Sequence, residues 1–420
     1  MRVVWDELSR PAQPRAVTEN VREILEDVRS RGDYAVAEYT ARFDHAEVAP
    51  ESLRVDAREL EAAVGVLEPA VLAGLRKAVE NVRTVARAQL REPAVAELPE
   101  GQRVEIVELP VRRVGVYAPG GRAVYPSSVV MCAVTARAAG VPDVAVCAPP
   151  GPGGRAHPVI LAACVLCEVT EVYRMGGAQA IAALAYGTQN VQPVDVIAGP
   201  GNAFVQEAKR QVVGQVGIDG IAGPSELFVV ASGDADPELI ALDLLAQGEH
   251  GPDSFLALAS PNRALLDAVA AAVERLAPDR PSVDPGVVLH VAHVKDERLA
   301  LWMAENLAPE HLQLVGRDAE ALADQVTRAG CLFVGPGAGT AFGDYVAGSN
   351  HVLPTGGAAR FQSALSAATF RRRMARVTLP GEAPGRLAPA GAALARAEGF
   401  PVHAESMERR QAGNSRLGRM

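Results

Sequence analysis

Two pairs of polar residues have types and spacings suited to metal or acid–base chemistry. Gln247 and His250 are three residues apart at the end of a predicted helix, so their side chains share one helical face and could bind one metal ion. Glu310 and His311 are adjacent and follow a proline. A carboxylate beside an imidazole is suited to general-base catalysis.

Three further candidates lie nearer the C-terminus. Asp344 follows the glycine-rich segment 335–339, and the tail carries Glu398 and His403. Mixed nitrogen and oxygen donors suit zinc or manganese, and such a set in this chain comprises Gln247, His250, Asp344 and His403. Taken singly, each of these residues is more often an ordinary surface side chain, and periodicity does not show that the four converge.

Two glycine-rich turns are candidates for binding phosphate. Gly176-Gly177 and Gly199-Pro200-Gly201-Asn202 each follow a predicted strand and open a predicted helix, where free backbone N–H groups can hold an anion. The second turn lacks the third glycine of the dinucleotide fingerprint, because Phe204 stands there. Glycine is common in strand-to-helix turns anyway, so a purely structural role stays open. A GxxxxGK[S/T] loop is absent from the sequence, which argues against an ATP or GTP hydrolase.

The cysteines and the N-terminus indicate a reduced, cytoplasmic chain. The five cysteines are an odd number, and acidic residues stand where a secretory signal needs an apolar core. No apolar run reaches the roughly 18 residues that span a bilayer. Cys164 and Cys167 have the spacing of half a zinc or redox motif, but we interpret them as buried helix thiols. Cys132 has no basic neighbour, so we give it no catalytic role.

Charge and composition exclude other classes. The 420 residues carry a formal net charge of −9, whereas a nucleic-acid-binding surface needs a basic domain or stripe. The densest basic cluster, Arg371 to Arg373, is interpreted as a solvated helix face. Because 49% of the residues are apolar, the chain can bury sizeable cores and is not disordered.

From residue 113 onward, short valine-rich runs alternate with longer helical stretches. This alternation is typical of a parallel sheet with helices on both faces. The predicted strands cover residues 114–117, 144–147, 171–174, 195–198, 226–231, 255–259, 287–291, 312–315 and 331–334. The first hundred residues show helical periodicity at 18–31 and 59–90, with a break at Pro69.

We therefore predict an α/β protein with two Rossmann-like βα lobes on parallel sheets, an N-terminal helical arm and a small C-terminal tail domain. The tail has predicted helices near Arg371 and Ala390. The predicted divisions are an arm at 1–12, a discontinuous first lobe at 13–116 and 226–365, a second lobe at 117–225 and a tail domain at 366–420.

Eight stretches, in this order along the chain, resemble the histidinol dehydrogenase family. They are 114–121 (VGVYAPGG), 176–181 (GGAQAI), 198–202 (AGPGN), 222–226 (AGPSE), 247–251 (QGEHG), 308–311 (APEH), 343–345 (GDY) and 350–355 (NHVLPT). An ordered set is far more specific than any one of its parts. The general resemblance extends from about residue 30 to residue 409.

The resemblance implies an NAD-linked, zinc-containing enzyme that oxidises L-histidinol through L-histidinaldehyde to L-histidine, the last step of histidine biosynthesis. Glu310 and His311 would form the catalytic pair. Neutral His311 would take the hydroxyl proton while hydride leaves for NAD⁺, and Glu310 would activate the water that hydrates the aldehyde. Zinc would anchor the substrate rather than activate water.

The resemblance also implies the binding residues. The zinc ligands would be Gln247, His250, Asp344 and His403. The substrate would contact those four, His311, Ser225 and Glu398. The residues matching the NAD site are Tyr117, Gln179 and Asn202. In the family, the tail of one subunit completes the active site of its dimer partner, so Glu398 and His403 would act in trans.

Two other functions stay open at this point. One is a related NAD-dependent dehydrogenase of another polar alcohol, which could keep Glu310-His311 and change its grip on the substrate. The other is a two-lobed small-molecule binding protein without chemistry. Ser225, Glu398 and the full ligand set favour histidinol as substrate, and turnover of any alcohol with NAD⁺ would eliminate the binding protein.

Overall fold

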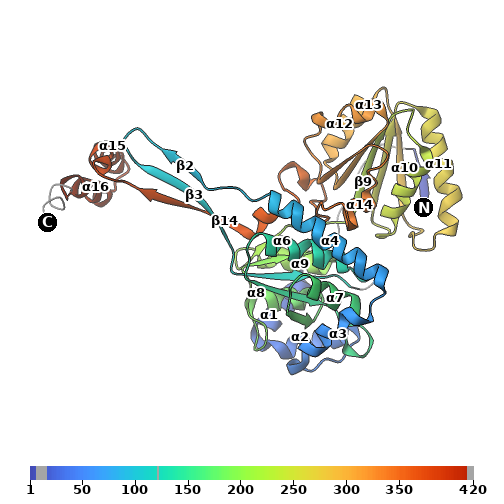
Figure 1. Cartoon of the computed structure of the whole chain (residues 1–420), viewed down its shortest axis with the longest axis horizontal. Coiled ribbons are helices and arrows are strands. Elements are labelled where there is room, and N and C mark those ends of the chain that lie inside the picture. The colour runs from blue at the N-terminus through green and yellow to red at the C-terminus, as the bar shows by residue number, and fades with distance from the viewer. Residues whose placement is uncertain (6–16, 121–122, 414–420) are drawn as a thin grey trace. The chain divides into compact units, whose positions relative to one another are not determined.

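The computed structural model describes residues 1–5, 17–120 and 123–413. The chain forms two compact units, which are described separately (Figure 1). The core unit comprises Met1–Gln89 and Val111–Phe370, and the tail unit comprises Leu90–Pro110 and Arg371–Met420.

The first sheet of the core unit, sheet A, has six parallel strands in the order β1-β11-β10-β9-β12-β13. Its strands are β1 (Arg2–Val4), β9 (Glu226–Ala231), β10 (Phe255–Ser260), β11 (Val288–His293), β12 (His311–Val315) and β13 (Cys331–Val334). Every residue of β9, β10 and β12 is buried. Strands that are buried along their whole length are covered by helices on both faces.

The second sheet, sheet B, has five parallel strands in the order β6-β5-β4-β7-β8. Its strands are β4 (Arg113–Tyr117), β5 (Asp143–Ala148), β6 (Glu171–Arg174), β7 (Val196–Ala198) and β8 (Gly217–Ile218). The chain winds outward from β4 to β6 and then returns to β7 on the other side of β4. The strand order therefore reverses between β4 and β7, and open α/β sheets bind ligands beyond the carboxyl ends of the strands at such a point.

Helices cover both faces of both sheets (Figure 1). Sheet A is covered on one face by α10 (Pro237–Gly248) and α11 (Arg263–Leu276), and on the other by α12 (Glu297–Leu307) and α13 (Arg317–Glu320). One face of sheet B holds α1 (Thr18–Arg31), α2 (Asp33–Asp44), α8 (Gly177–Tyr186) and α9 (Ala203–Val212). Its other face holds α3 (Ala57–Ala62), α4 (Pro69–Ala88), α5 (Pro126–Val129), α6 (Thr135–Ala138) and α7 (Pro158–Leu166).

These elements confirm the predicted α/β class with parallel sheets, but the N-terminal segments divide differently. The sequence prediction grouped residues 13–116 with 226–365, whereas α1 to α4 pack on sheet B. Helical periodicity shows which face of a helix is apolar, but not which sheet that face covers. Within the predicted arm at 1–12, residues 2–4 form β1, which pairs with β11 at the edge of sheet A. The part of the arm beyond residue 5 lies outside the described residues.

The tail unit contains an antiparallel sheet and two helices. Its strands are β2 (Ala94–Glu97), β3 (Arg103–Pro110) and β14 (Arg371–Thr378), in the order β14-β3-β2. Its helices are α15 (Ala383–Ala397) and α16 (Pro401–Gly413). The predicted helix near Ala390 is confirmed, but the predicted tail domain at 366–420 omitted residues 90–110.

The predicted helix near Arg371 is wrong, because Arg371 to Arg373 lie in strand β14. In that strand, Arg373 stands opposite Glu108 and Arg376 stands opposite Glu105. Their guanidinium groups lie 2.9 and 3.0 Å from those carboxylates. The glutamates that face these arginines are more than 260 residues away in the sequence. The basic run therefore gives no local sign of a strand, and by itself it resembles a helix face.

The cysteines are free thiols, and Cys132, Cys164 and Cys167 are buried as the sequence predicts. Burial raises the pKa of the Cys167 thiol to about 12 and that of the Cys132 and Cys164 thiols well above the ordinary range, so none of the three is a thiolate near neutral pH. Among the described residues, every helix is too short or too polar to cross a membrane.

Candidate active site

The candidate catalytic pair lies at the amino end of β12, next to the amino end of its neighbour β9 in sheet A. Glu310 immediately precedes β12, His311 is its first residue, and Glu226 is the first residue of the adjacent β9. Helix α12 ends at Leu307 and is followed by Ala308, which has a left-handed backbone with φ 47°. The chain therefore turns sharply into the strand and presents Glu310 and His311 at this edge.

A reciprocal pair of hydrogen bonds holds Glu310 against Glu226. The backbone N–H of Glu226 donates to Oε2 of Glu310 at 2.9 Å, and the backbone N–H of Glu310 donates to Oε2 of Glu226 at 3.1 Å. The other oxygen of Glu226 accepts from the N–H of Gly356 at 3.1 Å. Both carboxylates are buried. Sequence reasoning assigned no role to Glu226; the available signal was a charged residue opening an otherwise apolar strand.

The ring of His311 has a defined orientation and tautomer. Its Nδ1 lies 2.9 Å from the carbonyl oxygen of Glu226, and a carbonyl only accepts, so Nδ1 carries a hydrogen. In the neutral ring, Nε2 is then the free base, and it lies 3.7 Å from Oδ1 of Asp344. Burial lowers the pKa of His311, but the carboxylates of Glu310 and Asp344 outweigh burial and hold that pKa well above its ordinary value.

Asp344 connects His311 to a second histidine. It lies in α14 (Thr340–Tyr345). Burial raises the pKa of Asp344, yet the neighbouring imidazoles, His311 first, bring it below the ordinary value. Nδ1 of His351 lies 2.8 Å from the backbone oxygen of Asp344, and burial lowers the pKa of His351. The sequence analysis included His351 in a family motif without assigning it a role.

Three predicted residues lie at and beyond the end of α10 and at the start of β9. Gln247 is in the last turn of that helix and is buried, and its Oε1 has no hydrogen-bond partner among the described residues. Nδ1 of His250 lies 3.2 Å from Oγ of Ser225, and His250 is one of the imidazoles close enough to contribute to the lowered pKa of Asp344. Because α10 packs against α14, the structure brings Ser225, His250 and Asp344 to the edge where Glu310 and His311 lie.

The donor set of this edge fits a zinc ion in type. Gln247 offers an unpaired buried amide oxygen, His250 an imidazole nitrogen and Asp344 a carboxylate, and zinc accepts such mixed ligands. In the part of the chain that the structure describes, three or more His, Cys, Asp or Glu side chains do not gather in a metal-binding arrangement. Amide side chains such as that of Gln247 are not among those residue types. His403 and Glu398 belong to the tail unit, where His403 lies against the ring of Phe400.

The predicted cofactor residues lie at the carboxyl ends of the strands of sheet B. Tyr117 ends β4, and its hydroxyl accepts a hydrogen bond from the N–H of Gly177 at 3.1 Å. Both amide atoms of Gln179 are buried without a partner among the described residues. Oδ1 of Asn202 caps α9 by accepting from the N–H groups of Phe204 and Val205 at 3.1 and 3.2 Å. Tyr117 and Asn202 flank the point where the strand order reverses, and the helix that carries Gln179 begins beside Tyr117. The unpaired amide of Gln179 fits a polar ligand there.

The family model of histidinol dehydrogenase matches residues 8–411. The chain belongs to the histidinol dehydrogenase family. It is 43% identical over 407 residues to the histidinol dehydrogenase of Gluconobacter oxydans, covering 95% of this chain and 94% of that protein. The enzyme of Rhizobium meliloti is 44% identical, with 92% of this chain and 90% of that protein covered.

A solved structure supports the same family. The crystal structure of histidinol dehydrogenase from Elizabethkingia anophelis superposes with a TM-score of 0.92 at 30% identity, covering 98% of both chains. The resemblance noted in the sequence is therefore confirmed over almost the whole chain. Membership of the histidinol dehydrogenase family supports an oxidoreductase of histidine biosynthesis.

Proposed function

We propose that this protein oxidises L-histidinol through L-histidinaldehyde to L-histidine with two NAD⁺, and that it contains zinc. The observation that carries this proposal is the fixed pair of Glu310 and His311 in a chain of the histidinol dehydrogenase family. In its neutral form, His311 would keep its Nδ1–H on the carbonyl of Glu226 and leave Nε2 as the base, and Glu310 is held beside it by backbone hydrogen bonds. An alcohol oxidation needs a base at this position.

In the first oxidation, Nε2 of His311 takes the proton of the substrate hydroxyl while the carbon-bound hydrogen leaves as hydride. The products are histidinaldehyde, NADH and a protonated His311. The carboxylates of Glu310 and Asp344 stabilise the imidazolium that forms, because both lie close to the ring. A zinc ion bound to Asp344 would offset the negative charge of that carboxylate. The pKa of His311 would then fall, which favours the neutral base before turnover.

In the second oxidation, the aldehyde first adds water to form its hydrate. Glu310 is suited to take a proton from that water, because Oε2 is fixed by the N–H of Glu226 and the carboxylate is thereby held in one orientation. Once His311 has released its first proton to solvent, it accepts the hydroxyl proton of the hydrate as the second hydride leaves. The products are the carboxylate of L-histidine and a second NADH.

The residues proposed to hold NAD⁺ and zinc are those that the family resemblance implies. Tyr117, Gln179 and Asn202 would contact NAD⁺, supported by the unpaired amide of Gln179 at the strand-order reversal. The zinc ligands would be Gln247, His250, Asp344 and His403, supported by the unpaired Oε1 of Gln247. When bound, NAD⁺ would supply the hydride acceptor, and zinc would supply a Lewis acid that holds the imidazole and amino nitrogens of the substrate.

We further propose a cytoplasmic homodimer in which Glu398 and His403 act at the partner's site, with Ser225 as a substrate contact from the core unit. The support is the apolar surface of the tail unit. Its described buried apolar cluster consists of alanines, whereas Leu394, Phe400 and Val402 are 67%, 53% and 73% exposed. An apolar surface on so small a core is typical of a unit that packs against another subunit.

The metal requirement tests the proposal. The protein is dialysed against a chelator, its zinc content is measured, and NADH formation from L-histidinol is followed before and after zinc is restored. We expect turnover to disappear with the metal and to return with zinc. Full turnover by metal-free protein would contradict the zinc assignment, and no turnover by zinc-loaded protein would favour another polar alcohol as substrate.

A further inference from the structure

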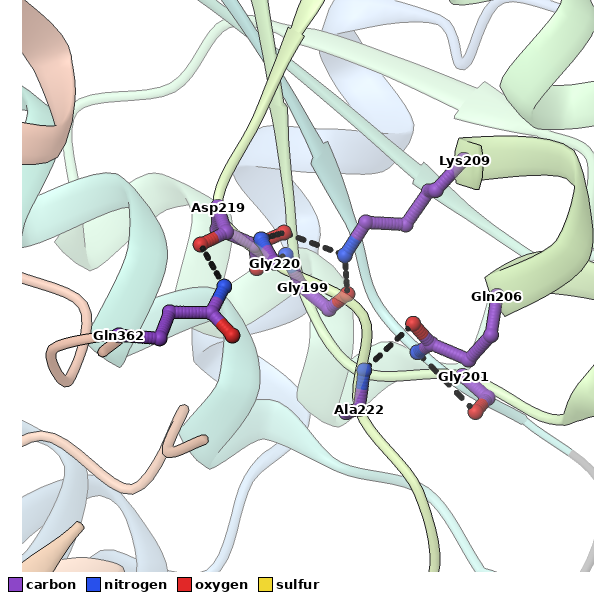
Figure 2. Close-up of polar contacts among 8 residues, drawn as sticks. All are labelled: Gly199, Gly201, Gln206, Lys209, Asp219, Gly220, Ala222 and Gln362. Carbon is purple, nitrogen blue, oxygen red and sulfur yellow. Dashed lines mark hydrogen bonds and ion pairs between the residues drawn. The ribbon is translucent and has the colours of Figure 1, made fainter. Parts of the chain in front are cut away.

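A buried ion pair joins helix α9 to the segment that connects the two sheets (Figure 2). Its members are Lys209 and Asp219, whose side chains are only 1% and 3% exposed. Taking both charges out of water carries a desolvation cost that an apolar pair of similar volume avoids. The pair is therefore a poor choice for stability alone, and the groups it contacts indicate another role.

The ion pair fixes both backbone polar groups of Gly199. Nζ of Lys209 donates to the carbonyl oxygen of Gly199 at 3.0 Å, and Oδ2 of Asp219 accepts from the N–H of Gly199 at 2.8 Å. Gly199 has φ 126°, and a Cβ there would lie 2.1 Å from the carbonyl oxygen of Tyr117. The pair thus holds the turn Gly199–Asn202 against the end of β4.

A second side chain of α9 makes a parallel link one helical turn earlier. Nε2 of Gln206 donates to the carbonyl oxygen of Gly201 at 3.3 Å, and its Oε1 accepts from the N–H of Ala222 at 2.8 Å. Figure 2 shows Gln206 and Lys209 reaching from the helix to the same two chain segments. The glycine turn and the connecting segment are therefore held together at both ends.

The connecting segment leads from this network directly to the candidate active site. On its other side, the backbone oxygen of Asp219 accepts from Nε2 of Gln362 at 3.2 Å, and the N–H of Gly223 donates to Oγ1 of Thr355. Two residues after Gly223, the segment reaches Ser225, which lies beside His250. One network thus spans the turn at the predicted cofactor site and the segment that ends at the substrate site.

We propose that Lys209 and Asp219 are positioning residues that set the Gly199–Asn202 turn for NAD⁺ and hold it in register with the segment leading to Ser225. This inference rests on the proposed binding of NAD⁺ at sheet B. Neither side chain would touch the dinucleotide. The pair acts through the backbone of Gly199, so its loss should weaken dinucleotide binding before it affects the binding of histidinol.

The test compares Lys209→Met and Asp219→Asn with the wild-type protein and with Arg210→Met. Arg210 is the matched control, because it is the next residue of the same helix and makes an exposed ion pair with Glu207. Dissociation constants for NADH are measured by its fluorescence and those for L-histidinol by calorimetry on zinc-loaded protein. Thermal unfolding is recorded for every variant.

We expect the NADH dissociation constant to rise about tenfold or more in both variants, because charge-assisted hydrogen bonds to the turn are lost. Histidinol binding should stay within about twofold of wild type, as should all binding by Arg210→Met. Unchanged NADH binding in folded variants would overturn the inference, as would an equal loss of both ligands. If Lys209→Met does not fold, Asp219→Asn decides. Wild-type protein that fails to bind NADH would instead overturn the proposed function itself.

Discussion

Replacing Glu226 by glutamine removes one of the two acceptor oxygens that hold the candidate catalytic carboxylate in place. In the wild type, Oε2 of Glu226 accepts from the N–H of Glu310 and Oε1 accepts from the N–H of Gly356. A glutamine of the same shape has one oxygen and one NH₂ group, so one of these two N–H groups must face a donor. Because the site is buried, water does not readily replace the lost acceptor.

The expected loss of catalytic rate follows from the loss of one hydrogen bond. One lost hydrogen bond to a charged acceptor is worth about 1.5–3 kcal/mol. If the loss acts on the placement of Glu310 in the transition state, kcat falls by a factor of about 10 to 150. The binding of NAD⁺ should not change, because Glu226 lies in sheet A and the predicted dinucleotide residues flank sheet B.

Steady-state oxidation of L-histidinaldehyde and L-histidinol at saturating NAD⁺ measures the effect. The matched control is Glu238→Gln, since Glu238 is an exposed glutamate paired with Arg275 on the surface. We expect the control to match the wild type. A Glu226→Gln protein with wild-type kcat for both substrates would refute the reasoning that this carboxylate positions Glu310.

Four further outcomes are expected. His311→Asn should lower the first oxidation by about two orders of magnitude or more while zinc content stays constant; wild-type turnover would contradict the base assignment. Glu310→Gln should impair oxidation of histidinaldehyde without changing the NADH dissociation constant, and a defect confined to NADH affinity would oppose its role. Mixing His403→Ala with His311→Asn subunits should restore some activity; no rescue after proven subunit exchange would count against a shared site. Burial raises the pKa of Asp44 to about 6 from 3.8, so the folded state is penalised once the carboxylate ionises, and Asp44→Asn should raise Tm more at pH 8 than at pH 4. A Tm gain that does not depend on pH would contradict this linkage.

Much of the fold follows from local pattern. The short apolar runs predict most strands of both parallel sheets within one or two residues, for example β9 at Glu226–Ala231 and β13 at Cys331–Val334. The short outer strands β1 and β8 were not predicted. Pro69 is the first residue of α4, as the predicted break requires. These elements were predictable because buried parallel strands are continuously apolar, and because proline opens a helix more readily than it continues one.

The parts that sequence reasoning missed depend on contacts between distant segments. Strand β14 pairs along its whole length with β3, where Arg373 and Arg376 face glutamates. Helices α1 to α4 pack on sheet B because their apolar side chains complete its two apolar clusters. The spacing of apolar residues, 3.6 in a helix and 2 in a strand, shows which face of an element is buried. It does not show which distant segment that face packs against.

Some residues of the candidate site are predictable from the sequence and others are not. Glu310 and His311 stand out as neighbours with chemical side chains, and the ordered motifs point to the histidinol dehydrogenase family. The roles of Glu226 and Lys209 do not stand out, since they lie in hydrogen bonds to backbone groups far along the chain. A charged residue opening an apolar strand marks Glu226 as unusual, but it does not name the backbone groups that Glu226 contacts, and Lys209 in a helix gives no local signal at all.

The most direct test of the account is the number of NADH molecules formed for each L-histidinol consumed by the zinc-loaded protein. A limited amount of L-histidinol is converted with excess NAD⁺, and NADH and L-histidine are both quantified at completion. The account predicts two NADH and one L-histidine for each L-histidinol, and a His311→Asn protein that forms almost none. One NADH with accumulating aldehyde, or no NADH at all, would contradict the proposed four-electron oxidation.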